Sequence, residues 1–156
     1  MQLVQKIYNL YGKSTICMKN NEPIHEFAGD SAEWRLYNMH SSKEMARLAY
    51  EALDEKKGED IRVIEIKDIS IIADYFVIAN GTNASQVDAL VDSVREKLGR
   101  AGIEPQRIEG IRTASWILMD YGDVVVHVFS RDDRLFYNLE RIWRDGKTIS
   151  KDQLED

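Results

Sequence analysis

Hydrophobic and polar residues follow two rhythms after residue 40, and each predicts a different kind of element. Two stretches repeat apolar residues every three or four positions, which indicates amphipathic helices. Ser41 and Glu44 form a capping box at the start of the first helix, and Thr82 or Asn83 caps the second. The predicted inward residues of the two helices are Met45, Leu48, Ala49, Ala52, Leu53, Val87, Leu90, Val91, Val94 and Leu98.

Other stretches are shorter and rich in β-branched and aromatic residues, which is typical of strands. The apolar run Tyr75–Ala79 is continuous, so it predicts a strand covered on both faces. Pro105 places the strand at 103–109 at an edge of the sheet. The remaining predicted strands are 61–66, 116–121 and 124–129.

A last helix is predicted from Asp132 or Asp133 to Gly146. Its expected inward residues are Leu135, Phe136, Leu139, Ile142 and Trp143. The order helix, strand, strand, helix, three strands, helix predicts a mixed α/β (α+β) fold, with a mixed sheet of about five strands packed with three helices.

Three segments differ in pattern. Residues 1–40 show no sustained period and predict a poorly packed N-terminal extension with a short helix near Leu3 to Tyr11. Residues 41–146 predict the folded domain, and residues 147–156 predict a polar, frayed tail. One hypothesis is that Met39 is the natural start of the protein.

The sequence from Trp116 to Phe129 predicts a hairpin with its turn at Gly122 and Asp123. In the favoured register Trp116 faces Phe129, and a shift by one residue would oppose two carboxylates. One face then carries Ile117, Met119, Tyr121, Val124, Val126 and Val128, as expected for a core. The other carries Trp116, Leu118, Asp120, Val125, His127 and Phe129.

This second face has two interpretations. It can be buried as well, with Asp120 at the rim and His127 bonded to backbone. Alternatively it is a partly exposed patch for a protein partner, because aromatic anchors with a few charges are typical of interfaces. The candidate partner-binding residues are Trp116, Leu118, Asp120, Gly122, Asp123, His127 and Phe129.

Charge and cysteine content narrow the function classes. The net charge of −6 lies entirely after His40, since each charge sign occurs four times before it. An acidic domain repels phosphate backbones and attracts basic proteins, so direct nucleic-acid binding is not expected. The single cysteine, Cys17, indicates a reducing compartment, and no apolar run is long enough for a membrane span. A cytoplasmic location is therefore expected.

No catalytic constellation, metal site or cofactor site is predicted. Gly81-Thr82-Asn83 lies between a strand and a helix, where backbone N–H groups can hold an anion. It lacks the lysine and second glycine of a P-loop, so a capped turn is the favoured interpretation. His127 has no second histidine or cysteine near it in sequence, which favours a structural role.

Four blocks in order resemble the Iojap family of ribosomal silencing factors. They are Asp74–Thr82, Gly102-Ile103 with Glu109-Gly110, Trp116–Phe129, and Phe136–Trp143, within a likeness that runs from about Ser42 to Gly146. The resemblance implies a nucleotidyltransferase-like fold in which Gly81-Thr82 stands where those enzymes have Gly-Ser. The paired metal-holding carboxylates of those enzymes have no clear counterpart here.

The resemblance also implies a function. Family members bind the large ribosomal subunit through the ribosomal protein L-fourteen, block subunit joining and lower translation under nutrient limitation. They can form homodimers, and they act by binding rather than as enzymes. The alternative is a divergent nucleotidyltransferase-like enzyme that uses the Gly81-Thr82 turn, and a third possibility is an interaction module unrelated to translation.

Overall fold

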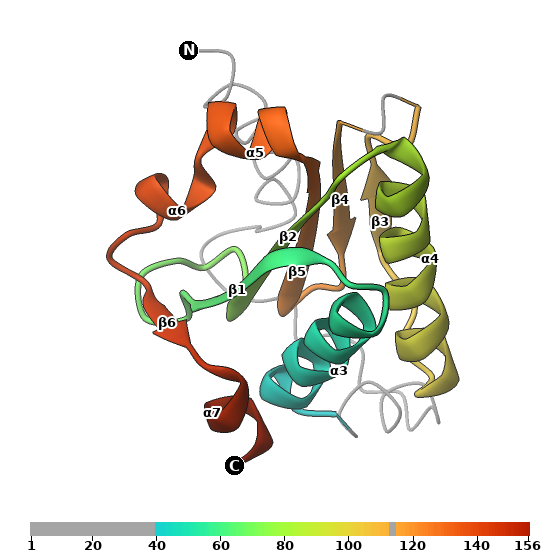
Figure 1. Ribbon diagram of the computed structural model, residues 1–156. Helices are drawn as coiled ribbons and strands as arrows, with labels where there is room; N and C mark the ends of the chain where they lie inside the picture. The colour runs from blue at the N-terminus through green and yellow to red at the C-terminus, as the bar shows by residue number, and fades with distance from the viewer. Residues whose placement is uncertain (1–39, 113–114) are drawn as a thin grey trace, which may run out of the picture. The chain divides into compact units, whose positions relative to one another are not determined.

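The computed structural model describes residues 40–112 and 115–156, which build a six-stranded mixed sheet in the order β3-β4-β5-β2-β1-β6 (Figure 1). The predicted mixed α/β fold is confirmed, with one strand more than the five expected. The strands are β1 Glu59–Glu65, β2 Tyr75–Gly81, β3 Arg107–Glu109, β4 Trp116–Asp120, β5 Val124–Ser130 and β6 Lys147–Ile149.

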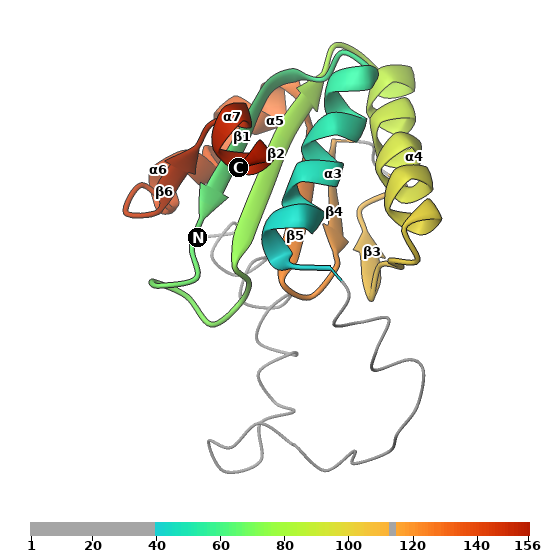
Figure 2. The same ribbon diagram turned by 90° about the horizontal axis from the view of Figure 1, so that it is seen from below.

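Two long helices, α3 (Ser42–Glu55) and α4 (Ala84–Arg100), cover one face of the sheet (Figure 2). The Ser41 hydroxyl accepts the Glu44 N–H at 3.1 Å, and the Asn83 side chain accepts the Gln86 N–H at 2.9 Å. Both caps were predicted, and they satisfy N–H groups that the helix cannot pair. Every predicted inward residue of the two helices is buried except Leu48, which is partly buried.

The strand β2 lies in the middle of the sheet and is buried along its whole length, as its continuous apolar run predicts. It pairs antiparallel with β1 and parallel with β5. The helix α4 connects β2 to β3, which forms an edge of the sheet as Pro105 indicates. The first face of the sheet and these two helices share one hydrophobic core.

The predicted last helix is wrong in part. The chain forms two short helices, α5 (Arg131–Tyr137) and α6 (Leu139–Ile142), separated by Asn138 in the left-handed conformation at φ 44°. This residue breaks the helical period, so the apolar positions on its two sides no longer share a face. Of the five residues expected to face inward, Leu139 is buried and Trp143 partly buried, whereas Leu135, Phe136 and Ile142 are exposed.

The prediction that residues 147–156 fray is also wrong. The strand β6 pairs antiparallel with β1, and α7 (Lys151–Glu155) follows it. Ser150 and Gln153 form a capping box at the start of α7, and Leu154 is buried in the core. Strand pairing uses backbone groups and needs no apolar pattern at an edge, so the polar sequence gave no sign of it.

The predicted N-terminal extension, with its helix near Leu3 to Tyr11, lies outside the described residues apart from His40. Within residues 40–112 and 115–156, no helix has the length and apolar character needed to cross a membrane.

Candidate partner-binding site

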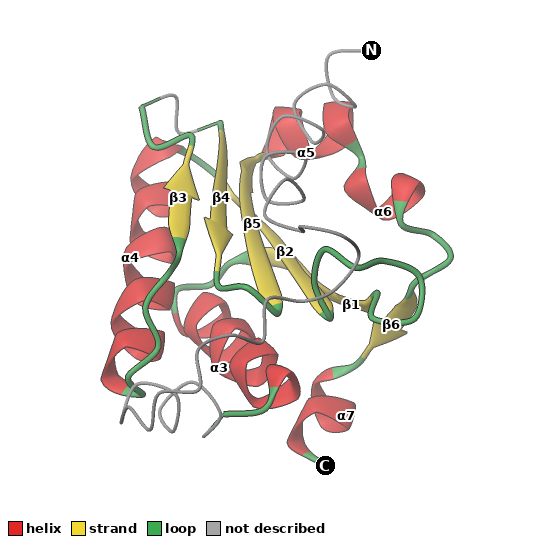
Figure 3. Ribbon diagram, turned by 180° about the vertical axis from the view of Figure 1, so that it is seen from behind, coloured by secondary structure: helices red, strands yellow, loops and turns green. Residues whose placement is uncertain are grey.

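The strands β4 and β5 lie side by side as a hairpin (Figure 3), and their residues pair in the predicted register. Trp116 pairs with Phe129, Leu118 with His127 and Asp120 with Val125. The Tyr121 N–H donates to the Val124 carbonyl at 2.9 Å, and Gly122 has the positive φ of 85° that this tight turn requires. The two sets of side chains therefore lie on opposite faces, as the sequence indicates.

The first face of the hairpin belongs to the core beneath α3 and α4. Its six predicted members are buried together with the inward residues of the two helices: Ile117, Met119, Tyr121, Val124, Val126 and Val128. This half of the sequence prediction is confirmed.

The second face is buried in the structure. Trp116 and Leu118 are 2% exposed, and His127 and Phe129 are 1% exposed. Of the two interpretations open from sequence, burial is therefore the one observed. Contact between these four side chains and a partner stays a prediction, because it requires that they become accessible.

His127 makes a specific side-chain bond rather than the expected bond to backbone. The Trp116 Nε1–H donates to His127 Nδ1 at 3.1 Å. Since Nδ1 accepts, the proton of the neutral imidazole lies on Nε2, which has no hydrogen-bond partner among the described residues. Burial lowers the pKa of His127 from 6.5 to about 3, so the ring is neutral at physiological pH.

An aromatic cluster surrounds this pair. The ring centroids of Trp116 and Phe129 lie 5.1 Å apart, those of Trp116 and Tyr137 4.7 Å apart, and those of Phe76 and His127 4.8 Å apart. Trp143 meets Phe76 edge-on at 5.2 Å. Aromatic pairs at these separations add about 0.5–1.5 kcal/mol each beyond the area they bury. The cluster therefore ties β2, the hairpin and the α5–α6 segment together.

The sequence did not predict that Tyr137 and Phe76 belong to this cluster. Tyr137 was not among the residues of the last helix expected to face inward, but it packs on Trp116. Phe76 joins the cluster because β2 pairs in parallel with β5, which aligns Phe76 with Val125. Parallel partners are distant in sequence and carry no turn signal, so the pattern could not identify this pairing.

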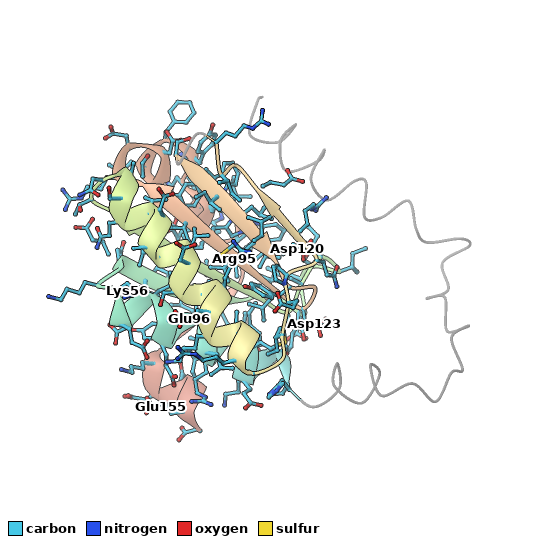
Figure 4. All side chains as sticks on the ribbon, turned by 90° about the vertical axis from the view of Figure 1, so that its right-hand side faces the viewer. Lys56, Arg95, Glu96, Asp120, Asp123 and Glu155 are labelled. Carbon is cyan, nitrogen blue, oxygen red and sulfur yellow. The ribbon has the colours of Figure 1, made fainter. Side chains whose placement is uncertain are left out.

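The turn end of the hairpin is more accessible. Asp120 Oδ1 accepts the Gly122 N–H at 2.8 Å, and Asp120 Oδ2 lies 3.5 Å from Arg107 Nη2 on the neighbouring strand. Asp123 is exposed, but partial loss of water contact raises the pKa of its carboxyl, and Asp74 adds to this effect. Both carboxylates lie near the same end of the sheet (Figure 4). Arg107 was not predicted, although it stands directly opposite Asp120.

The Gly81-Thr82-Asn83 turn works as a helix cap, which is the favoured interpretation from sequence. Gln86 Oε1 accepts the Thr82 N–H at 2.7 Å, while Asn83 caps α4. These bonds use the Thr82 N–H and the Asn83 side-chain oxygen. Over the part of the chain that the structure describes, no three His, Cys, Asp or Glu side chains gather as a metal ion would require.

Comparison with known proteins agrees with this architecture. Residues 39–156 match the family model described as "Ribosomal silencing factor during starvation". The chain is 44% identical over 109 residues to a ribosomal silencing factor of Halalkalibacterium halodurans, covering 70% of this chain and 93% of the relative. It is 39% identical over 112 residues to that of Bacillus subtilis, covering 72% and 95%. A crystal structure of a Chromobacterium violaceum protein superposes with a TM-score of 0.66 at 36% identity, covering 71% of this chain and 92% of that one.

Proposed function

Since this chain belongs to the family of ribosomal silencing factors, we propose that it binds the large ribosomal subunit through the ribosomal protein L-fourteen. Bound there, it blocks joining of the small subunit and lowers translation in the cytoplasm under nutrient limitation. The family match across residues 39–156 carries this proposal. Steric exclusion needs a rigid body and a contact surface, and it needs no catalytic residue.

The proposed contact region is the second face of the β4–β5 hairpin together with its turn. Asp120, Gly122 and Asp123 lie at the accessible end, where carboxylates can accept charge-assisted hydrogen bonds from Arg or Lys of a basic ribosomal protein. The acidic charge of the domain favours the approach of such a partner. Four buried side chains of the same hairpin support the turn: Trp116, Leu118, His127 and Phe129. We propose that they also contact the partner, which requires that binding exposes them.

Cosedimentation with purified large subunits in sucrose gradients tests the partner. We expect the protein in the large-subunit fraction and not in the small-subunit fraction. We expect Asp123→Asn to weaken this binding, because it removes a charge at the turn, whereas Asp88→Asn removes the same charge from the exposed side of α4 and leaves binding unchanged. Equal binding by both variants would remove Asp123 from the contact, and absence of all binding would overturn the proposed partner.

The enzyme alternative has its own test. A divergent nucleotidyltransferase would bind nucleotide and magnesium at the Gly81-Thr82 turn, so ATP or CTP with magnesium would raise the melting temperature in a saturable way. We expect no such rise, because Asn83 and Gln86 already occupy the polar groups of this turn. We also propose that the protein forms a homodimer, as the family resemblance implies. Sedimentation of the protein alone measures its oligomeric state.

A further inference from the structure

A cavity of about 590 Å³ opens between α5–α6 and the β1 side of the sheet. This volume lies within the range of small-molecule sites, roughly 300–1,000 Å³. Its lining comes from β1, the end of β2, α5, the segment after α6 and β6. None of the seven candidate partner-binding residues lines it.

One residue that lines the cavity is a buried arginine with several hydrogen bonds. Arg134 donates to Glu140 Oε1 from Nε at 3.1 Å and from Nη2 at 2.6 Å. Its Nη1 donates to Asn80 Oδ1 at 2.9 Å and to the Glu59 carbonyl at 3.2 Å. A buried guanidinium with all these partners is held in one position, so it forms a fixed polar wall.

The charges around the cavity do not balance. Four guanidinium groups line it against three carboxylates, those of Glu59, Asp60 and Glu140. Glu59 binds Arg131 and Asp60 binds Arg62, while Glu140 binds Arg134. The Arg144 side chain is exposed and has no ion-pair or hydrogen-bond partner among the residues that the structure describes. One positive charge with five N–H donors therefore remains available at this cavity.

The neighbouring residue adds an unpaired donor. Trp143 lines the cavity, and its buried Nε1–H makes no hydrogen bond with any residue that the structure describes. The indole ring itself is fixed edge-on against Phe76, and together with Ile64 and Leu135 it gives the cavity an apolar side.

Backbone strain gathers at the same place. Asp60 and Asn138 have positive φ angles of 45° and 44°, and both line the cavity. The pairing of β1 with β2 also shifts register between Glu59 and Arg62. Strained residues and bulges persist where the surroundings hold them, and they are common beside ligand sites.

From this combination we infer that the cavity binds a small organic anion, with a carboxylate or phosphate head on Arg144 and an apolar or aromatic body against Trp143. The free guanidinium supplies the charge that the head requires. The mixed lining accounts for a body as well as a head, because a bare inorganic anion would leave the apolar side uncovered. The inference concerns this cavity alone and does not depend on ribosome binding.

Calorimetric titration of the full chain tests the inference with four probes. Adenosine monophosphate and indole-3-acetate carry an aromatic body with a phosphate or a carboxylate head, so they distinguish the two kinds of head. Inorganic phosphate lacks the body, and adenosine lacks the head. We expect saturable binding of at least one probe that has both parts. We expect at least about tenfold weaker binding of either half, since each half lacks contacts that the complete probe makes.

Two arginine variants locate the bound probe. We expect Arg144→Gln to weaken binding at least about tenfold. Arg141 is equally exposed but does not line the cavity, so Arg141→Gln removes the same charge and leaves binding unchanged. Equal effects of the two variants, no binding of either complete probe, or equally tight binding of phosphate alone would each overturn the inference. Circular dichroism of both variants confirms that they are folded.

Discussion

The two faces of the central sheet are built from the same strands but by different rules. The first face is uniformly apolar and lies under α3 and α4, so its side chains need nothing except close packing. The second face mixes rings with polar groups, including the Trp116–His127 hydrogen bond and the buried Arg134 network. Burial of polar groups is favourable only when each finds a partner, so the second face is the more specific and the more easily disturbed.

The largest expected effect tests whether the second face also supports the fold. Trp116 is 2% exposed, so Trp116→Ala should lower the free energy of unfolding by about 3–5 kcal/mol. On the first face, Leu90→Ala should cost about 2–5 kcal/mol. Urea denaturation followed by circular dichroism measures both losses. A loss below about 1 kcal/mol for Trp116→Ala would mean that this ring adds little to stability and is available to a partner.

The next effect separates the faces by pH. The pKa of His127 is about 3 in the folded protein and 6.5 when unfolded. As the pH falls, the imidazole of the unfolded protein takes up a proton before that of the folded protein. The free energy of unfolding is therefore unaffected by this group above pH 6.5 and decreases as the pH falls toward 3. Between about pH 6 and pH 4 the free energy of unfolding should fall by roughly 1.4 kcal/mol per pH unit more steeply than in His127→Leu.

The matching experiment is urea denaturation of the protein and of His127→Leu across this pH range. Parallel pH profiles for the two proteins would show that the imidazole already exchanges its proton with water in the folded state. That result would contradict the burial of His127 at the centre of the second face.

At the hairpin turn, substitution of Asp123 is expected to raise the free energy of unfolding, by less than the losses expected at Trp116 and His127. Burial raises the pKa of Asp123, with Asp74 adding to it, so its ionised form destabilises the folded protein at neutral pH and this cost disappears as the pH falls. Asp123→Asn should raise the free energy of unfolding at pH 7 by at most about 1 kcal/mol and have no effect near pH 3. Asp88→Asn is the control, and an equal gain from that variant would contradict the local cause.

The smallest effect concerns the N-terminal extension. A chain that begins at Met39 should bind large subunits as tightly as the full chain, because the family match begins at residue 39. Gradient cosedimentation at several protein concentrations compares the two. Tighter or weaker binding by the shorter chain would give residues 1–38 a role in partner binding. Mass spectrometry of the native protein tests the separate hypothesis that Met39 is the natural start, and peptides from before Met39 would reject it.

The two faces also differ in how far the sequence predicts them. Helical periodicity and capping residues locate α3 and α4. The turn at Gly122 and Asp123, with the avoidance of opposed carboxylates, gives the register of the hairpin. Interactions on the second face are long-range: Tyr137 reaches Trp116, and Arg134 reaches Asn80. Neither contact leaves a periodic signal, because each depends on parallel pairing of β2 with β5 and on the break at Asn138.

The candidate site shows the same limit. Its seven residues were grouped correctly on one hairpin and its turn, since alternation decides which side chains share a face. Their exposure could not be predicted, because that depends on what packs above the face rather than on the strand itself. The polar β6 segment was missed for a related reason, since backbone pairing with β1 needs no apolar residues.

Subunit joining is the most direct test of the proposed function. Purified large subunits are incubated with the protein, small subunits and magnesium are added, and light scattering follows formation of the joined ribosome. The account predicts that the scattering increase falls in proportion to the protein bound and vanishes at saturation. A full increase with large subunits that demonstrably carry the protein would contradict it.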